Sequence, residues 1–195
     1  SVEATMARAV EYFGALHVLF NCAGGSVPED SVVTEVDMSV WDRAIPLDLK
    51  GPFLCSRFGI PKIIDSGGGA VVNVSSVVAL RGNHPAHVYS AAKGGVISFS
   101  KSIAKEVGRH NINVNVLSPG ATNSPMRIGL QEGLKEKLGE ERWLAREEKV
   151  KRLYPLRRIG EMEDISNTAM FLTSDVARHI TGQVLSVNGG FAMVG

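Results

Sequence analysis

Tyr89 and Lys93 are the residues of this sequence best suited to move a proton. They stand four residues apart in a helical pattern, so their side chains share one face of the expected helix. A free tyrosine loses its proton only near pH ~10, and a neighbouring ammonium lowers that pKa because it stabilises the phenolate. A tyrosine with a lowered pKa can give and take a proton in general acid–base catalysis.

Ser76 adds a hydroxyl group to this pair. It follows a β-branched run, and a hydroxyl at that place can hold a substrate oxygen and stabilise the charge that develops on it. The pair alone is weak evidence, since Tyr-x-x-x-Lys arises by chance in many proteins. The alternative is a tyrosine that packs on a helix beside a solvated lysine, and the bare pair favours this alternative.

Alternating helices and strands must position these residues. Helical patterns lie at 1–13, 38–64, 87–109 and 163–172, and further helical patterns lie in the polar segment 121–158. Short apolar or β-branched runs predict strands at 17–20, 70–74, 112–117 and 183–187. Prolines should bend or break the long stretch 38–64, because each removes a backbone donor; they are Pro46, Pro52 and Pro61.

Strands that alternate with helices predict a doubly wound α/β fold, with a parallel sheet and helices on both of its faces. Ligands of such sheets bind beyond the carboxyl ends of the strands. The unusual residues of this sequence follow three of the expected strands, at 21–24, 75–76 and 119–120. The candidate site should therefore lie at one edge of the sheet.

Composition excludes several classes of function. The 195 residues are 44% hydrophobic and 21% charged with a net charge of +1, which gives no support to nucleic-acid or membrane-surface binding. No apolar run is long enough to span a bilayer. Cys22 and Cys55 stand in apolar surroundings and are expected to be buried free thiols, which favours a cytoplasmic location. No metal site is expected, because no carboxylate or cysteine joins His84 and His87 at ligand spacing.

Four separated motifs resemble the short-chain dehydrogenase/reductase family and occur in the family's order. They are Asn21-Cys22-Ala23-Gly24, where the family usually has Asn-Asn-Ala-Gly, then Asn73-Val74-Ser75-Ser76, Tyr89-Ser90-Ala91-Ala92-Lys93 and Ser118-Pro119-Gly120. Shorter matches at 41–43, 49–51 and 181–190 extend the resemblance over nearly the whole chain. The resemblance implies one Rossmann-like oxidoreductase domain over residues 1–195, which interconverts a secondary alcohol and a ketone with NAD or NADP.

The resemblance also assigns roles to residues. Tyr89 would be the catalytic acid and base, Ser76 would polarise the substrate oxygen, and Lys93 would bind the nicotinamide ribose and lower the pKa of Tyr89. Asn21, Ala23 and Gly24 would line the adenosine side of the cofactor. The nicotinamide side would be flanked by Pro119, Gly120, the backbone of Thr122, and Ser124. The partners implied are a small alcohol or ketone substrate and further copies of the chain.

Asp48 departs from the family pattern. The family has an asparagine at this position, which supports a relay water through its backbone carbonyl at a helix kink. Aspartate and asparagine are nearly isosteric and differ mainly in donors and charge, so we favour a tolerated substitution over impaired catalysis. If ionised, Asp48 should stabilise the Lys93 ammonium and cancel part of its effect on Tyr89.

A second departure concerns the family's Gly-rich turn, which cradles the pyrophosphate at a helix N-terminus. Residues 1–195 do not contain that turn, nor the strand whose end distinguishes NAD from NADP. We therefore expect an N-terminally incomplete domain, in which the strand at 17–20 is an open apolar edge. The alternative is a catalytically silent module for oligomerisation or binding, against which the intact Ser76, Tyr89 and Lys93 argue.

Residues 121–160 correspond to the family's substrate-covering lid. Ten Lys/Arg and six Glu lie between 127 and 158, which would suit an anionic substrate such as an acyl thioester. We favour a solvated helix surface with pairs such as Glu147 with Lys151. Three residues could contact substrate or anchor the lid: Trp143, Leu144 and Tyr154.

Two further features leave alternatives open. His84 and His87 lie at the edge of the expected substrate pocket, where either could contact substrate. The helices near 53–64 and 87–109 carry apolar and small residues that suit close packing. They would either form the interface of a homodimer or homotetramer or belong to the core.

Overall fold

The sheet of the protein contains four parallel strands. In the computed structural model, which describes residues 1–26 and 28–193, they lie in the order β1-β2-β3-β4. Their bounds are β1 Val18–Asn21, β2 Gly69–Val74, β3 Ile112–Pro119 and β4 Val184–Val187. The register pairs Val18 with Ala70, Gly69 with Ile112, and Val116 with Val184. The predicted parallel α/β fold is confirmed.

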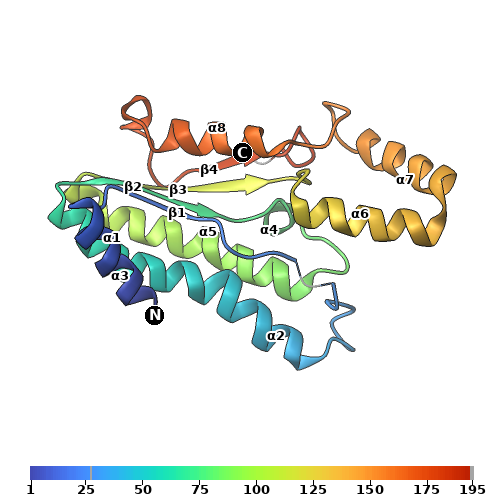
Figure 1. The fold of residues 1–195 in the computed structure, drawn as a ribbon, viewed down its shortest axis with the longest axis horizontal. Helices are drawn as coiled ribbons and strands as arrows, with labels where there is room; N and C mark the ends of the chain where they lie inside the picture. Colours follow the sequence, from blue (N-terminus) through green and yellow to red (C-terminus); the bar gives the residue numbers. More distant parts are fainter. Residues whose placement is uncertain (27, 194–195) are drawn as a thin grey trace.

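Helices cover both faces of the sheet (Figure 1). One face carries α1 (Val2–Phe13), α3 (Gly51–Asp65) and α5 (His87–Val107), and the other carries α8 (Met162–Leu172). Beyond the sheet lie α2 (Met38–Ile45), α4 (Val78–Arg81), α6 (Pro125–Leu138) and α7 (Glu140–Arg152). Short π and 3-10 turns span Pro46–Lys50, Gly108–His110 and Asp175–Ala177. The helices α6 and α7 form a hairpin that projects from the end of the sheet (Figure 1).

The sheet buries two separate apolar clusters, because side chains alternate between its faces along each strand. Val71 and Val114 pack with Ile63 of α3 on one face. Val72 and Leu117 point to the other face, where Leu172 of α8 contacts them. The strand β2 is therefore apolar on both faces, as expected for an inner strand of a parallel sheet.

The last crossover differs in hand from the first two. The chain reaches β2 and β3 through α3 and α5, which pack on the same face. It then continues in the same direction across the sheet to β4, but through α8 on the opposite face. Crossovers between parallel strands are almost always of one hand, so this step is an exception within the fold.

The proline-containing stretch at 38–64 is one bent helical run. Pro46 begins the π turn that separates α2 from α3, which confirms the expected irregularity there. Pro52 lies in the first turn of α3, where a missing backbone donor costs little. Pro61 lies inside α3, which continues to Asp65, so of the bend or break expected at that residue the break does not occur.

Two further expectations need correction. Cys22 is exposed and Cys55 is half-buried, so the prediction of two buried thiols is wrong. Glu147 does not pair with Lys151: it faces α6 and pairs with Arg127 at 2.7 Å, while Lys151 pairs with Glu148 at 2.7 Å. The i,i+4 rule fails here because a cation of the neighbouring helix reaches Glu147.

The outer edge of β1 is open among the described residues. The strand pairs only with β2, and Val18 and Phe20 expose 44% and 41% of their surface. This confirms the apolar edge expected from the sequence. None of the helices in residues 1–26 and 28–193 is long and apolar enough to cross a bilayer.

Ile63 provides a test of the larger apolar cluster. It is 0% exposed, and its truncation to alanine should lower the free energy of unfolding by about 2–5 kcal/mol, because a cavity remains. The matched control is Ile128→Ala on α6, where the isoleucine is 47% exposed and the loss should stay within about 0.5 kcal/mol. Urea unfolding of both variants measures the difference, and equal losses would contradict this packing.

Candidate active site

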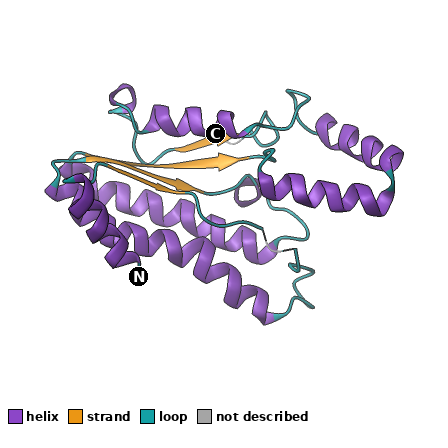
Figure 2. Cartoon of the chain, viewed as in Figure 1, coloured by secondary structure: helices purple, strands orange, loops and turns teal. Residues whose placement is uncertain are grey.

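The carboxyl ends of three strands bring the candidate residues together. Figure 2 shows the loops that leave this end of the sheet. Asn21 ends β1, Ser76 follows β2, and Pro119 ends β3. The backbone N–H of Ser75 donates to the Leu117 carbonyl at 2.7 Å, and that of Val77 donates to the Pro119 carbonyl at 3.0 Å. Ser76 is therefore held beside the end of β3.

Lys93 is the buried cation of the site. Lys93 is 2% exposed. Its Nζ donates a hydrogen bond to the Val74 carbonyl at 3.1 Å and forms a salt bridge with Asp48 Oδ1 at 3.1 Å. The same nitrogen lies 5.7 Å from the centroid of the Tyr89 ring. The structure thus brings together the pair that the helical spacing indicated. An ammonium has three donors, so one remains after these two described contacts.

Asp48 lies in the π turn between α2 and α3 and is 0% exposed. Such π turns occur often at functional sites. Besides Lys93, Oδ1 accepts the backbone N–H of Gly25 at 3.0 Å. Oδ2 is buried and has no hydrogen-bond partner among the described residues. The carboxylate therefore binds the lysine directly and also holds the glycine turn after β1.

Gly24 is required by the closeness of this turn to Asp48. Its φ is +130°, and a Cβ at this position would lie 2.2 Å from Asp48 Oδ1 and 3.3 Å from Lys93 Nζ. Any larger residue would push the turn away from the ion pair. Ala23 and Gly24 are exposed, so their backbone is open to a ligand.

Tyr89 has a raised pKa. The pKa of its phenol is raised to about 12, chiefly by burial and also by the charges of Asp48 and Cys22, whereas the hydrogen bond with the Ser76 hydroxyl lowers it. The lowering of the Tyr89 pKa that was expected from Lys93 is not found: burial raises that pKa, and Lys93 is paired with Asp48. The phenol is protonated at neutral pH in this state.

The two serines after β2 have different roles. Ser75 is 2% exposed, and its hydroxyl donates to the Lys93 carbonyl at 2.8 Å, which fastens α5 to the sheet. Ser76 is half-buried, and its Oγ accepts the Val78 N–H at 3.4 Å. Ser76 is the serine whose hydroxyl acts on Tyr89.

The side chain of Asn21 is buried and hydrogen-bonded inside the protein. Its amide donates to Asn73 Oδ1 at 2.7 Å, and Asn73 donates to Ser100 Oγ at 2.9 Å. These buried bonds tie the end of β1 to β2 and α5. A cofactor beside this turn would therefore meet the backbone of residues 21–24 and not the Asn21 amide.

The segment after β3 is also held by contacts within the protein. Gly120 lies so close to Asn188 that a Cβ would be 3.0 Å from that residue's Cα. The Thr122 hydroxyl donates to the Gly120 carbonyl at 3.2 Å. Ser124 caps α6 and accepts the Arg127 N–H at 3.3 Å. Ser124 thus has a structural role that the sequence did not indicate.

The chain matches known proteins in sequence and in fold. The family model described as enoyl-(acyl carrier protein) reductase matches residues 1–192. The 3-oxoacyl-[acyl-carrier-protein] reductase FabG of Staphylococcus aureus is 38% identical over 192 residues, which cover 98% of this chain and 72% of that protein. FabG of Chlamydia muridarum is 37% identical over 191 residues, with 98% and 71% covered.

Solved structures agree with these relatives. ElxO with NADP bound superposes with a TM-score of 0.87 at 27% identity, covering 97% of this chain and 73% of that one. A short-chain type dehydrogenase/reductase from Mycobacterium ulcerans gives a TM-score of 0.85 at 30% identity, with 97% and 65% covered. This chain belongs to the short-chain dehydrogenase/reductase family. It is an NAD(P)-dependent oxidoreductase.

Tyr154 supports the segment after β3 in this dehydrogenase/reductase. It is 5% exposed, and its hydroxyl accepts the Ala121 N–H at 3.2 Å. Its ring stacks on Phe191 with centroids 4.8 Å apart, and the Arg81 guanidinium lies 4.2 Å from the Phe191 centroid. Of the two roles open for Tyr154, this burial favours the anchor. No spacing rule could have found contacts between residues so distant in sequence.

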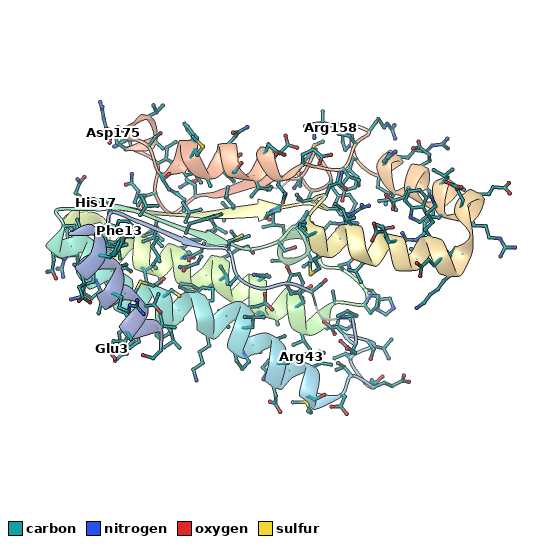
Figure 3. The ribbon with its side chains drawn as sticks, viewed as in Figure 1. Glu3, Phe13, His17, Arg43, Arg158 and Asp175 are labelled. Carbon is teal, nitrogen blue, oxygen red and sulfur yellow. The ribbon has the colours of Figure 1, made fainter. Side chains whose placement is uncertain are left out.

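A salt bridge joins the loop between α7 and α8 to the first turn of α8. Arg158, in the loop between α7 and α8, pairs with Asp164 at 2.7 Å (Figure 3). That ion pair lowers the pKa of Asp164 to about 2. Within residues 1–26 and 28–193, no group of three or more His, Cys, Asp or Glu residues is placed to hold a metal ion.

Asp48→Asn should move the pH dependence of catalysis. The Asp48 charge raises the pKa of Tyr89, so its removal should lower that pKa. Alcohol oxidation needs the phenolate, which forms above this pKa, and the oxidation profile of the variant should therefore shift to lower pH. The measurement is kcat/KM for oxidation across pH, with the exposed Asp42→Asn on α2 as control. Superimposable profiles for the parent and Asp48→Asn would show that Asp48 does not act on Tyr89.

Proposed function

We propose that this enzyme reduces the ketone of a 3-oxoacyl thioester to a secondary alcohol with NADPH. One observation carries the proposal: the phenol of Tyr89 lies in hydrogen-bonding reach of the Ser76 hydroxyl, and it keeps its proton at neutral pH because even an ordinary tyrosine has a pKa of ~10. A protonated phenol at neutral pH is an acid, which is what carbonyl reduction requires. The curated relatives are named as 3-oxoacyl-[acyl-carrier-protein] reductases, which supports the substrate class.

Each catalytic residue has a separate task in this proposal. The cofactor supplies the hydride to the carbonyl carbon. The Tyr89 hydroxyl gives its proton to the carbonyl oxygen, and the Ser76 hydroxyl donates a hydrogen bond to that oxygen as charge develops on it. Lys93 holds the ribose with its remaining donor, and Asp48 holds Lys93 in place.

The residues at the sheet edge fit a dinucleotide. Gly24 lacks the Cβ that would collide with Asp48, so the exposed backbone of this turn can lie beside the ion pair, where we place a ribose. We assign the adenosine side to Asn21, Ala23 and Gly24, through their backbone. We assign the nicotinamide side to Pro119, Gly120, Thr122 and Ser124. NADP is proposed over NAD because ElxO was solved with NADP, and a tyrosine-to-phenylalanine variant of ElxO with NADPH.

Residues 121–160 are proposed as the lid over the substrate. The hairpin of α6 and α7 starts at the catalytic edge, where a Cβ on Gly25 would lie 3.3 Å from Met126 Sδ. Met126, Ile128 and Leu130 are about half exposed on α6 and can cover an acyl chain. Lys149, Arg152 and Arg157 are exposed on or beside α7 and suit an anionic carrier.

A homodimer is proposed through the outer faces of α3 and α5. A groove of about 330 Å³ lies between them, lined by Phe53, Ile60 and Ile64 of α3 and by Phe99 and Ile103 of α5. Phe53 is 48% exposed and meets Phe99 edge-on with ring centroids 6.5 Å apart. An exposed apolar groove of this kind marks an interaction site, and a homotetramer would add a second interface.

Tyr89→Phe tests the chemistry. With acetoacetyl-CoA and NADPH, the variant should lose nearly all turnover, about 100-fold or more, while its circular dichroism and unfolding midpoint stay close to the parent. The loss is expected because phenylalanine keeps the ring and removes the proton donor. A parent that turns over no better than Tyr89→Phe would favour the silent binding module.

Phe53→Arg tests the dimer. Light scattering after size exclusion should give twice the chain mass for the parent and one chain mass for the variant, because a charge in the apolar groove opposes association. The control is Phe13→Arg on α1, where the phenylalanine is 75% exposed and lies outside the groove. A parent that is monomeric at every concentration would contradict the interface.

A further inference from the structure

Asp30 is a buried carboxylate that binds the first turn of α5, the helix that carries Tyr89, although the two are distant in sequence. It lies in the loop between β1 and α2 and is 5% exposed. Its Oδ2 accepts the backbone N–H of Val88 at 3.0 Å and of Tyr89 at 3.2 Å. The second of these amides belongs to the catalytic tyrosine itself.

The helix α5 has no cap of its own. Its N-cap residue is Ala86, no side chain from the N-cap position bonds to the first turn, and that turn contains no acidic residue. The first amides of a helix lack partners within the helix and form its positive end. Asp30 therefore supplies both the missing acceptor and the favourable charge.

We propose that Asp30 is a positioning residue that fixes the place of the Tyr89 hydroxyl. Tyr89 is the third residue of α5, in the part of a helix that frays when it is not capped. Lys93 lies one turn further and is held by Asp48 and the Val74 carbonyl. Loss of the cap should therefore displace Tyr89 relative to Lys93, and Ser76 should stay with the sheet.

The residues on either side of the contact between Asp30 and Val88 are held against α2. Glu29, the neighbour of Asp30, pairs at 2.7 Å with Arg43, which lies on α2 (Figure 3). Val88, whose amide Asp30 binds, packs with Val40 and Ala44 of α2. The cap is thus set against α2, which leads directly into the π turn that carries Asp48.

The inference rests on the proposed reductase function, because it acts through the proton transfer by Tyr89. The test compares Asp30→Ala and Asp30→Asn with the parent, well below their unfolding midpoints, with acetoacetyl-CoA and NADPH. Asp30→Ala should lower kcat by about 10- to 100-fold, because a small displacement of a catalytic group has effects of that size. The dissociation constant of NADPH should change by less than about twofold, because Lys93 stays in place. Asp30→Asn keeps one acceptor oxygen and should recover most of the rate.

Two controls separate positioning from mere stability. Asp37→Ala removes the same kind of cap from α2, where Asp37 accepts the Ser39 N–H at 2.8 Å, and should leave kcat unchanged. In the double variant Asp30→Ala with Tyr89→Phe, the rate should equal that of Tyr89→Phe alone. Hydrogen exchange should accelerate at the amides of Val88 and Tyr89 in Asp30→Ala, and not at Lys93.

The outcomes are distinct. A parent no faster than Tyr89→Phe refutes the proposed function, and the inference about Asp30 falls with it. A fast parent with Asp30→Ala at the same kcat refutes the positioning role alone. An additive loss in the double variant, or a parallel loss of NADPH affinity, also refutes it, because either shows an effect that does not run through Tyr89.

Discussion

A lysine ammonium and an aspartate carboxylate, both almost fully withdrawn from solvent, meet at 3.1 Å where the π turn approaches α5. Breaking such a pair leaves an uncompensated buried charge, which costs about 3–5 kcal/mol. The neighbouring elements conform to this constraint. Gly24 leaves room for the carboxylate, Gly25 donates its amide to it, and the Val74 carbonyl at the end of β2 accepts from the ammonium. One ion pair thus joins four segments at this edge of the sheet: the π turn, α5, the glycine turn after β1 and the end of β2.

Burial and one member of this pair, Asp48, both raise the pKa of Tyr89. A lone lysine beside a phenol would favour the phenolate, but Asp48 returns a negative charge to the site and burial disfavours ionisation further. Both effects favour the protonated phenol. Asp48 differs from the family's asparagine in the negative charge that it adds beside Tyr89, and this charge acts on the tyrosine pKa in the same direction as burial.

Around this ion pair, buried polar side chains hold the backbone of neighbouring segments by hydrogen bonds. Asp30 holds the amide of Tyr89, Ser75 holds the Lys93 carbonyl, and Tyr154 holds the amide of Ala121. Each of these groups lies on a different segment from the one that it fixes. Tertiary hydrogen bonds of this kind hold the surrounding turns in one conformation. The backbone of Ala23 and Gly24, which is exposed, stays open to a ligand.

The sequence by itself determined the α/β class, the positions of the four strands and the proximity of Tyr89 to Lys93, because each follows from a local period of two or 3.6 residues. Its motifs also indicated the family. Only the tertiary structure decided the partner of Glu147, the exposure of Cys22, the persistence of α3 past Pro61, and the roles of Ser124, Asp30 and Tyr154. It also decided the sign of the pKa shift at Tyr89. These properties depend on groups that are distant in sequence and on the water that packing excludes, and no local pattern records either.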